Sequence, residues 1–321
     1  MGEGVDVRVR SVAPMVEKRP TAKPWWTQRR REALWFYIMA SPWIAGFLLF
    51  MGGPLVASLY LSFTDYDLLT PPEWVGLDNY VRMFTDDPRF WKVLRNTTVY
   101  TLLVVPITTV LSVWLAALLH KPLKGMRVFR TIVYVPALVP IVASAMLFSW
   151  VLAPDAGLLN RTLALVGIDG PAWLLDETWV IPGLVMMSVW GVGTGVVLLL
   201  AGMQGIPPEL LEAATIDGAN PRQRFFQITL PMLSPVILFN VIMGLIGTFQ
   251  VFSQVYILTG GGPNDASMML VPYIFEEAFR NFRMGYASAL SWLLFLIIMT
   301  CTAIVFKTSS RWVFYESEVR R

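Results

Sequence analysis

The amino-acid sequence predicts an all-α polytopic membrane protein with six transmembrane helices. Hydrophobic residues make up 55% of its 321 residues and charged residues only 15%, whereas soluble domains carry about 25% charged residues. Six stretches reach the roughly 20 apolar residues needed to cross a bilayer, and none contains Asp, Glu, Lys or Arg. One charge at the centre of a span costs about 2.5–3.5 kcal/mol, so six charge-free segments indicate spans. They cover about residues 34–63, 96–119, 131–153, 179–203, 232–258 and 286–306.

The spans divide the chain into three parts. Residues 1–33 form a polar, basic tail that we expect to be disordered, residues 34–306 form the six-span domain, and residues 307–321 form a second tail. The first segment is too long for the core of a cleaved signal peptide, which holds 7–15 apolar residues, so a retained anchor is expected. Gly52-Gly53-Pro54 predicts a kink within it.

The distribution of basic residues predicts the orientation. Of the 25 Lys and Arg residues, 18 lie in the two tails and in the loops after spans two and four. Positive charge stays on the cytoplasmic side, so both termini are expected to be cytoplasmic. The clearest local markers are Arg29-Arg30-Arg31 and the series Lys121, Lys124, Arg127 and Arg130.

The loop between spans four and five, residues 204–231, predicts a helix, a turn and a second helix. Pro207 and Pro208 suit a first helical turn, and Gly218 can adopt the left-handed conformation that ends a helix. Asn220 can then cap a second helix with Pro221 at its first position. The first helix would hold about nine residues, too few for stability alone in water, so it must pack against another surface.

This loop resembles the EAA loop of binding-protein-dependent ABC importer permeases. That pattern is Glu-Ala-Ala, three residues, Gly, nine residues, Ile, one residue and Leu-Pro, and the chain matches it without departure at Glu212-Ala213-Ala214, Gly218, Ile228 and Leu230-Pro231. Three motifs of the other loops resemble sugar-type permeases, and the first permease of maltose-type importers most of all. They are Gly76-Leu77-Asp78-Asn79-Tyr80 with Phe84, the run from Tyr256 to Asn264, and the run from Gly285 to Leu290.

The resemblance implies a type I ABC importer permease fold and a non-enzymatic role. By the resemblance, a sugar or sugar derivative, delivered by an extracytoplasmic solute-binding protein, passes by alternating access through this chain and a second homologous permease. Two ATPase subunits hold the ATP and Mg²⁺, and this chain needs no cofactor. The setting is a bacterial or archaeal cytoplasmic membrane, with lipid but no nucleic acid as a partner. The residues that contact the ATPase would be Glu212, Ala213, Ala214, Asp217 and Gly218.

Polar residues inside spans tend to face a bundle interior or a cavity, and they give candidates for the substrate path. On continuous helices, Trp190 and Thr194 would share a face, and so would Gln250 and Gln254. Thr248 lies about 200° away from Gln250, yet the maltose-type pattern points to Thr248, so both sets stay open. Helix–helix hydrogen bonding is the alternative role for each. In span four, Gly191 and Gly195 are spaced for close helix packing, and a flexible point in the helix is the alternative.

Rival functions lack their signals in the sequence. No phosphate-binding Gly-x-x-x-x-Gly-Lys-Ser/Thr loop and no His-Glu-x-x-His motif occur, so neither ATP hydrolysis nor metal catalysis is expected here. An ion-gradient-driven secondary transporter usually carries ionisable groups within the membrane, and the spans have none. It remains the alternative class, and glycerol-phosphate-like or other polyol solutes remain the alternative substrates.

Overall fold

The computed structural model describes Gly2 and residues 28–121 and 123–314. The tail 1–33 therefore lies largely outside the described residues, as does the end of the C-terminal tail. In chain order the elements are α1 (Gln28–Phe47), the π-helix η1 (Leu48–Gly52), α2 (Gly53–Leu61), β1 (Thr64–Asp65), β2 (Glu73–Trp74), α3 (Asp78–Thr85), α4 (Pro88–Leu119), α5 (Met126–Leu138), α6 (Ile141–Val151), α7 (Leu158–Ala164), α8 (Val180–Trp190), α9 (Gly193–Gln204), α10 (Pro208–Ile216), α11 (Pro221–Arg224), the π-helix η2 (Phe225–Thr229), α12 (Leu230–Phe249), α13 (Ser253–Leu258), α14 (Leu270–Phe279) and α15 (Met284–Ser309).

The chain forms two units, Met1–Val56 and Ala57–Arg321. In the first unit, α1 begins at Gln28, earlier than the predicted start at residue 34. A helix of 34 residues, Gln28–Leu61, includes the predicted kink at Gly52-Gly53-Pro54. Directly before Gly53 the helix has a π-helical turn, η1. Such turns are rare and occur mostly as single turns inside longer helices.

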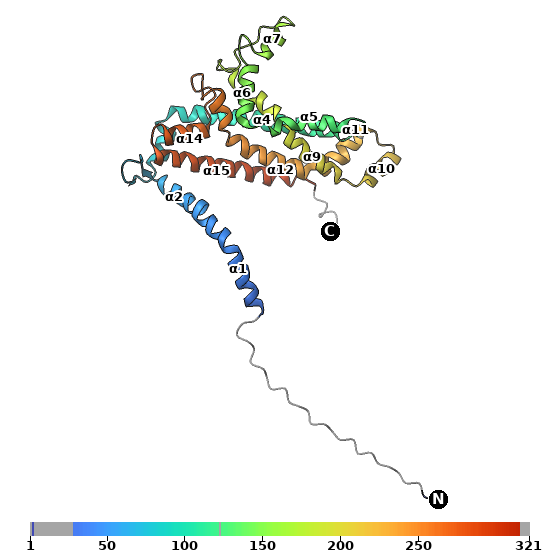
Figure 1. The fold of residues 1–321 in the computed structure, drawn as a ribbon, viewed down its shortest axis with the longest axis horizontal. Coiled ribbons are helices and arrows are strands. Elements are labelled where there is room, and N and C mark those ends of the chain that lie inside the picture. Colours follow the sequence, from blue (N-terminus) through green and yellow to red (C-terminus); the bar gives the residue numbers. More distant parts are fainter. Residues whose placement is uncertain (1, 3–27, 122, 315–321) are drawn as a thin grey trace. The chain divides into compact units, whose positions relative to one another are not determined.

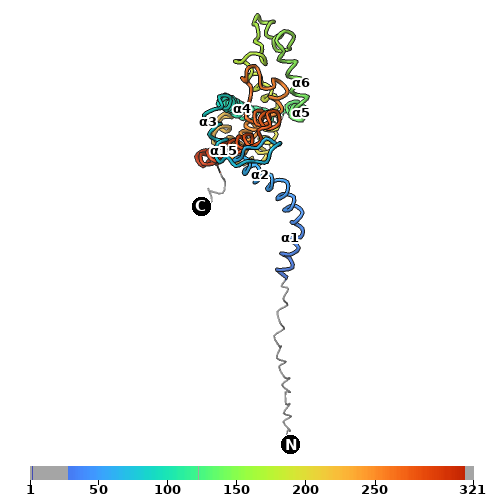
Figure 2. Tube along the Cα trace, turned by 90° about the vertical axis from the view of Figure 1, so that its left-hand side faces the viewer, coloured from blue at the N-terminus to red at the C-terminus, as the bar shows by residue number. Residues whose placement is uncertain are grey.

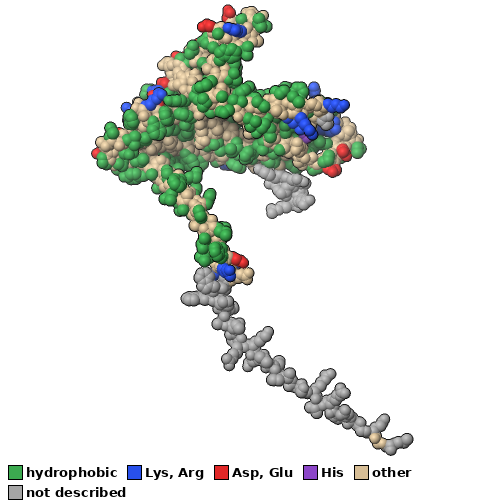
Figure 3. All heavy atoms as spheres, in the orientation of Figure 1, with side chains coloured by type: hydrophobic (Ala, Val, Ile, Leu, Met, Phe, Trp, Pro, Cys, Tyr) green, Lys and Arg blue, Asp and Glu red, His purple; other side chains and the backbone are tan. Residues whose placement is uncertain are grey.

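The second unit is a bundle of apolar helices. Helix α4 packs against α12, α9 and α8, and α12 packs in turn against α15 and α9. Figure 1 shows α4, α9, α12 and α15 alongside one another, and Figure 2 shows the bundle from its end. Helices α10 and α11 lie together at one end of the bundle, and α14 and the start of α15 lie at the opposite end, here called the distal end. Hydrophobic side chains cover much of the flank shown in Figure 3, as expected for helices in contact with lipid.

Two predicted spans are broken in the structure. Span three consists of α5 and α6, bent by 99°, and span four of α8 and α9, bent by 43°. The first break has a local cause, because a residue before proline is pushed out of the helical region and Val139, before Pro140, has an extended ψ of 130°. With each bent pair taken as one span, the described residues contain up to six apolar spans.

Span five also ends earlier than predicted. Helix α12 stops at Phe249, and α13 begins at Ser253 after a short non-helical segment. At its other end, α12 continues without interruption from α11 and η2, so that Pro221–Phe249 forms one helix of 29 residues. The loop that precedes this helix is therefore attached directly to a membrane span.

Glycines of span four allow close helix contacts, and one member of the predicted Gly191–Gly195 pair is among them. A Cβ added to Gly193 would lie 2.4 Å from the Val133 carbonyl oxygen of α5, and one added to Gly195 would lie 2.7 Å from the Ser112 hydroxyl of α4. Gly191, by contrast, sits at the break between α8 and α9 and would meet no other helix. The packing prediction is therefore confirmed for Gly195 and wrong for Gly191, which lies where the helix is interrupted.

A polar network fixes the distal end of the bundle. Asp87 caps α4 by accepting a hydrogen bond from the Phe90 N–H at 3.2 Å, and it also accepts hydrogen bonds from the hydroxyls of Tyr273 and Tyr286. Burial, followed by the Asp87 carboxylate, raises the pKa of Tyr273, so this phenol remains a donor. Close by on α4, Arg89 pairs with the carboxylates of Asp265 and Glu276 at 2.8 and 2.9 Å.

Candidate functional site: the helical elbow and the polar path

The segment between α9 and α12, which we call the elbow, follows local rules of helix initiation and termination. Its first helix, α10, has Pro208 in its first turn and the acidic Glu209 beside it, where the helix dipole favours negative charge. The helix ends through Gly218, whose φ is +83°. The Ala219 N–H donates to the Ala214 carbonyl at 2.9 Å and the Gly218 N–H to Thr215 at 3.1 Å, the pattern of a glycine-terminated helix.

The second helix, α11, begins with a capping box. The Asn220 side chain accepts from the Gln223 N–H at 2.9 Å, and the Gln223 side chain accepts from the Asn220 N–H at 2.8 Å. This reciprocal pair satisfies two N–H groups that would otherwise lack partners. The Arg224 guanidinium donates to the Thr215 hydroxyl at 2.6 Å across the turn. The two helices of the elbow are therefore tied together, and α11 continues into the span.

Helix α10 has an exposed surface against which no other described part of the chain packs. None of its residues is buried, although Ile206, just before it, packs into the core that α4 and α9 share. The residues predicted to contact a partner lie on or next to α10: Glu212, Ala213, Asp217 and Gly218 are exposed and Ala214 is half-buried. Ile216 is 88% exposed, and it lies one turn from Glu212 on the same face. Sequence analysis overlooked Ile216, although an apolar residue on a short loop helix could have signalled it.

The predicted substrate-path residues of span four do not share one continuous helix. Trp190 ends α8, and Thr194 lies in α9, beyond the 43° bend. Trp190 packs edge-on against Phe148 of α6 with ring centroids 5.6 Å apart, whereas Thr194 is exposed. The argument from shared helix face was wrong here because Gly191 and Val192 interrupt the helix.

The predicted residues of span five also separate. Gln250 is exposed at the end of α12, whereas Gln254 is buried in α13, so they do not share one helix face as predicted. Thr248 is buried, and its hydroxyl donates to the Gly244 carbonyl at 2.9 Å. Among the five path candidates, Thr194 and Gln250 are the exposed ones. The role of each in transport stays a prediction.

Gln254 belongs to a buried polar cluster that joins three helices. Its amide donates to the Leu184 carbonyl at 2.6 Å, and its side-chain oxygen accepts from the Tyr100 hydroxyl at 3.2 Å. The Ser188 hydroxyl lies 2.6 Å from that of Tyr100. The cluster ties α13 to α4 and α8 through hydrogen bonds. The sequence analysis did not select Tyr100, although a tyrosine within an apolar span could have indicated it.

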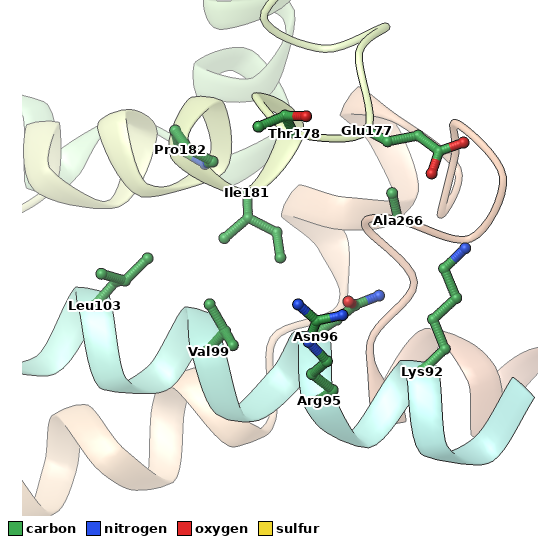
Figure 4. Close-up of a pocket in the computed structure, with 10 residues that line it drawn as sticks. All are labelled: Lys92, Arg95, Asn96, Val99, Leu103, Glu177, Thr178, Ile181, Pro182 and Ala266. Atoms are coloured by element: carbon green, nitrogen blue, oxygen red, sulfur yellow. The ribbon is translucent and has the colours of Figure 1, made fainter.

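A hollow of about 460 Å³ lies near the distal end, between α4 and the start of α8 (Figure 4). Lys92, Arg95 and Asn96 line it from α4, and Glu177 and Thr178 line it from the segment before α8. Lys92 donates to the Asn264 carbonyl, and the Asn264 amide donates to Glu177 at 3.2 Å. These contacts tie the rim of the hollow to the loop that precedes α14.

The other motifs of sugar-type permeases have structural positions at the distal end. The Asn79 amide donates to the carbonyls of Ser62 and Thr64 at 3.0 and 2.9 Å. A Cβ on Gly285 would lie 2.0 Å from the Thr64 carbonyl oxygen, so only glycine fits there. Asn79 therefore holds the loop after α2 against α3, and Gly285 allows the same loop to approach the start of the last span.

Comparison with known proteins identifies the family. Residues 108–314 match the family described as "Binding-protein-dependent transport system inner membrane component". The chain belongs to this family. It is 43% identical over 293 residues to the "Probable ABC transporter permease protein YesP" of Bacillus subtilis (strain 168), covering 90% of this chain and 94% of that relative. This membership places the chain among ABC transporter permeases and gives no support to the ion-gradient alternative.

Two further comparisons confirm the predicted subfamily and fold class. The chain is 33% identical over 279 residues to the "Trehalose/maltose transport system permease protein MalF" of Thermococcus litoralis (strain ATCC 51850 / DSM 5473 / JCM 8560 / NS-C), covering 86% of this chain and 94% of that permease. Its fold matches a chain in the "Crystal structure of a bacterial ABC transporter involved in the import of the acidic polysaccharide alginate". That match has a TM-score of 0.76 and 24% identity, and it covers 88% of this permease and 98% of the other chain.

Proposed function

We propose that this permease is one half of the membrane passage of a carbohydrate importer. The similar permease of Thermococcus litoralis is named for the transport of trehalose and maltose. Exposed polar groups of spans four and five, such as Thr194 and Gln250, can hydrogen-bond sugar hydroxyls. The solute comes from an extracytoplasmic binding protein, and a second, homologous permease completes the passage. Both termini lie in the cytoplasm, as the distribution of basic residues indicates.

The elbow is the proposed contact with the ATPase, and this contact is the centre of the proposal. The observation that carries it is the exposed nine-residue helix α10, joined through Gly218 and the capping box to the 29-residue helix Pro221–Phe249. A helix this short needs a packing partner. A push on Glu212, Ile216 or Asp217 would pass through the Arg224–Thr215 hydrogen bond into the span.

Movement between an inward-open and an outward-open state is the proposed consequence. ATP and Mg²⁺ bind to two partner ATPase subunits, whose closure displaces the elbow. The elbow joins spans four and five, and each of these spans is interrupted, between α8 and α9 and between α12 and α13. At each interruption one helix segment can rotate relative to the next. Thr194 and Gln250, each near one of these interruptions, would then change their exposure to the passage.

Replacing Gly218 by Val tests this proposal. A β-branched residue at φ +83° carries about 1–3 kcal/mol of strain. This strain favours a different backbone conformation at the end of α10. A change of about 1.4 kcal/mol is a factor of ten in an equilibrium, so we expect roughly tenfold less sugar transported per ATP hydrolysed. The matched control is Gly167→Val, because Gly167 has a φ of +77° and equally open surroundings but lies outside the elbow.

The assay is uptake of radiolabelled solute into vesicles that contain the assembled importer, together with phosphate release. A panel of sugars, polyols and glycerol phosphate is first tested on the cognate binding protein to choose the solute. Unchanged transport per ATP in Gly218→Val, with the same result in Gly167→Val, would refute a coupling role for the elbow. Binding of polyols alone would correct the substrate class and leave the coupling proposal standing.

A further inference from the structure

An apolar groove of about 890 Å³ runs along α4 beside α11, η2 and the start of α12. Exposed side chains of Val110, Trp114 and Phe226 line it. On α4, which ends at Leu119, the lining extends from Thr109 to Leu118, a rise of about 14 Å at 1.5 Å per residue. Half of a bilayer's hydrocarbon core is about 15 Å thick, so the groove matches the depth of one lipid leaflet.

The groove leads to a basic hollow at the same end of the bundle as α10 and α11. This second hollow, of about 380 Å³, shares Lys121 with the groove and is also lined by Lys124, Arg127 and Arg130. The Arg130 guanidinium is held in place by donating to the Leu119 carbonyl at 3.1 and 2.8 Å. Figure 3 shows basic side chains gathered at this end.

The positive charge of the hollow is not neutralised within the described part of the chain. The residues that line the groove and the hollow include no Asp or Glu, and the ion pairs found among the described residues lie elsewhere, around Arg89 and Arg283. Arg222 of α11 adds a further basic side chain to the groove wall. An anion placed here would meet several donors and no competing carboxylate.

We propose that the groove and the hollow together form a binding site for one anionic phospholipid. An acyl chain would lie along Val110 and Trp114, and the phosphate of the headgroup would lie among Lys121, Lys124 and Arg127. Basic pockets between membrane helices on the cytoplasmic side suit anionic headgroups, and this site combines such a pocket with an apolar groove of leaflet depth.

Part of the site lies within the elbow, which connects the lipid physically to α10. Phe225, Phe226 and Arg222 line the groove, and all three belong to the continuous helix that begins directly after the elbow's turn. A bound lipid would therefore brace the helix that moves when the ATPase acts. The cytoplasmic location of the site rests on the proposed function, which places the elbow on that side of the membrane. Binding of the lipid does not require that the elbow couples transport to ATP hydrolysis.

Quenching of Trp114 by brominated lipids tests the proposal. The importer is placed in phosphatidylcholine nanodiscs with increasing fractions of brominated phosphatidylglycerol or brominated phosphatidylcholine, without ATP. The fluorescence of a Trp114→Phe variant is subtracted, so that the difference reports the groove alone. One basic side chain near a membrane surface favours anionic lipid about fivefold, so we expect at least that preference for the glycerol headgroup.

Two double variants show whether the preference arises in the hollow. Lys124→Gln with Arg127→Gln is expected to bring the preference close to one. Lys307→Gln with Arg311→Gln removes the same charge from exposed positions outside the site and is expected to leave the preference unchanged.

Each contrary result overturns the proposal in a different way. Equal quenching by both lipids would show a groove without headgroup selectivity. No quenching of Trp114 would show that protein covers the groove. Loss of the preference on addition of soluble glycerol phosphate would show that the hollow binds free phosphate esters. Since the measurement uses neither ATP nor transport, a failure here is separate from a failure of the coupling proposal.

Discussion

Substitution of Gly193 by Ala should destabilise the bundle by about 1–3 kcal/mol. The added Cβ would lie 2.4 Å from the Val133 carbonyl oxygen and 3.0 Å from the Tyr134 Cα, whereas ordinary van der Waals contacts start at 3.4 Å. Both neighbours are backbone atoms of α5, so no side chain can rotate away, and the helices must separate by about 1 Å. Overpacking of this kind costs about 1–3 kcal/mol.

Gly247 provides the matched control, because a Cβ added there meets nothing within 4 Å. It lies inside α12, where alanine is favoured over glycine by up to about 1 kcal/mol, so Gly247→Ala should be neutral or stabilising. Free energies of unfolding are measured by titrating the detergent-solubilised importer with dodecyl sulfate. Equal stability of the two variants would refute the argument that α9 and α5 are in backbone contact at Gly193.

Two further predictions concern hydrogen bonds. Gln254→Leu removes the amide that joins Tyr100 to the Leu184 carbonyl and should lower the free energy of unfolding by about 1 kcal/mol, the usual size for buried polar pairs in membranes. In the same titration, Gln250→Leu at the exposed position should change little, and a loss equal to that of Gln254→Leu would contradict the assigned cluster. Asn220→Ala removes the capping box and should cost about 1 kcal/mol; faster hydrogen exchange at the start of α11 would show it, and unaltered exchange would speak against the cap.

The elbow could be predicted in detail from the sequence because its structure depends on local rules. Pro208, Gly218 and Asn220 determine where helices begin and end through their own backbone and side-chain chemistry, and the structure places each where that chemistry predicts. The apolar spans were visible for a similar reason, since the bilayer imposes length and composition on each segment separately.

The interruptions of the spans could be predicted only in part. Pro140 signals the break in span three and Gly191 marks the one in span four, yet Gln250, Val251 and Phe252 contain neither proline nor glycine. There, tertiary contacts override helix propensity. The buried cluster around Gln254 binds α13 to α4 and α8, which favours a separate short helix. Arguments from helix periodicity failed wherever they crossed such an interruption.

Cross-linking from position 216 tests the coupling proposal most directly. Cys301 is the chain's one cysteine, so a Cys301→Ser background carrying Ile216→Cys offers a single thiol, at a position that is 88% exposed in the wild type. Reacted in the assembled importer with a short photoactivatable cross-linker, this thiol should form an adduct with the ATPase subunit, and the yield should change when ATP is bound. An adduct with the solute-binding protein, or labelling of position 216 from outside intact cells, would contradict the proposal that α10 receives the ATPase's motion.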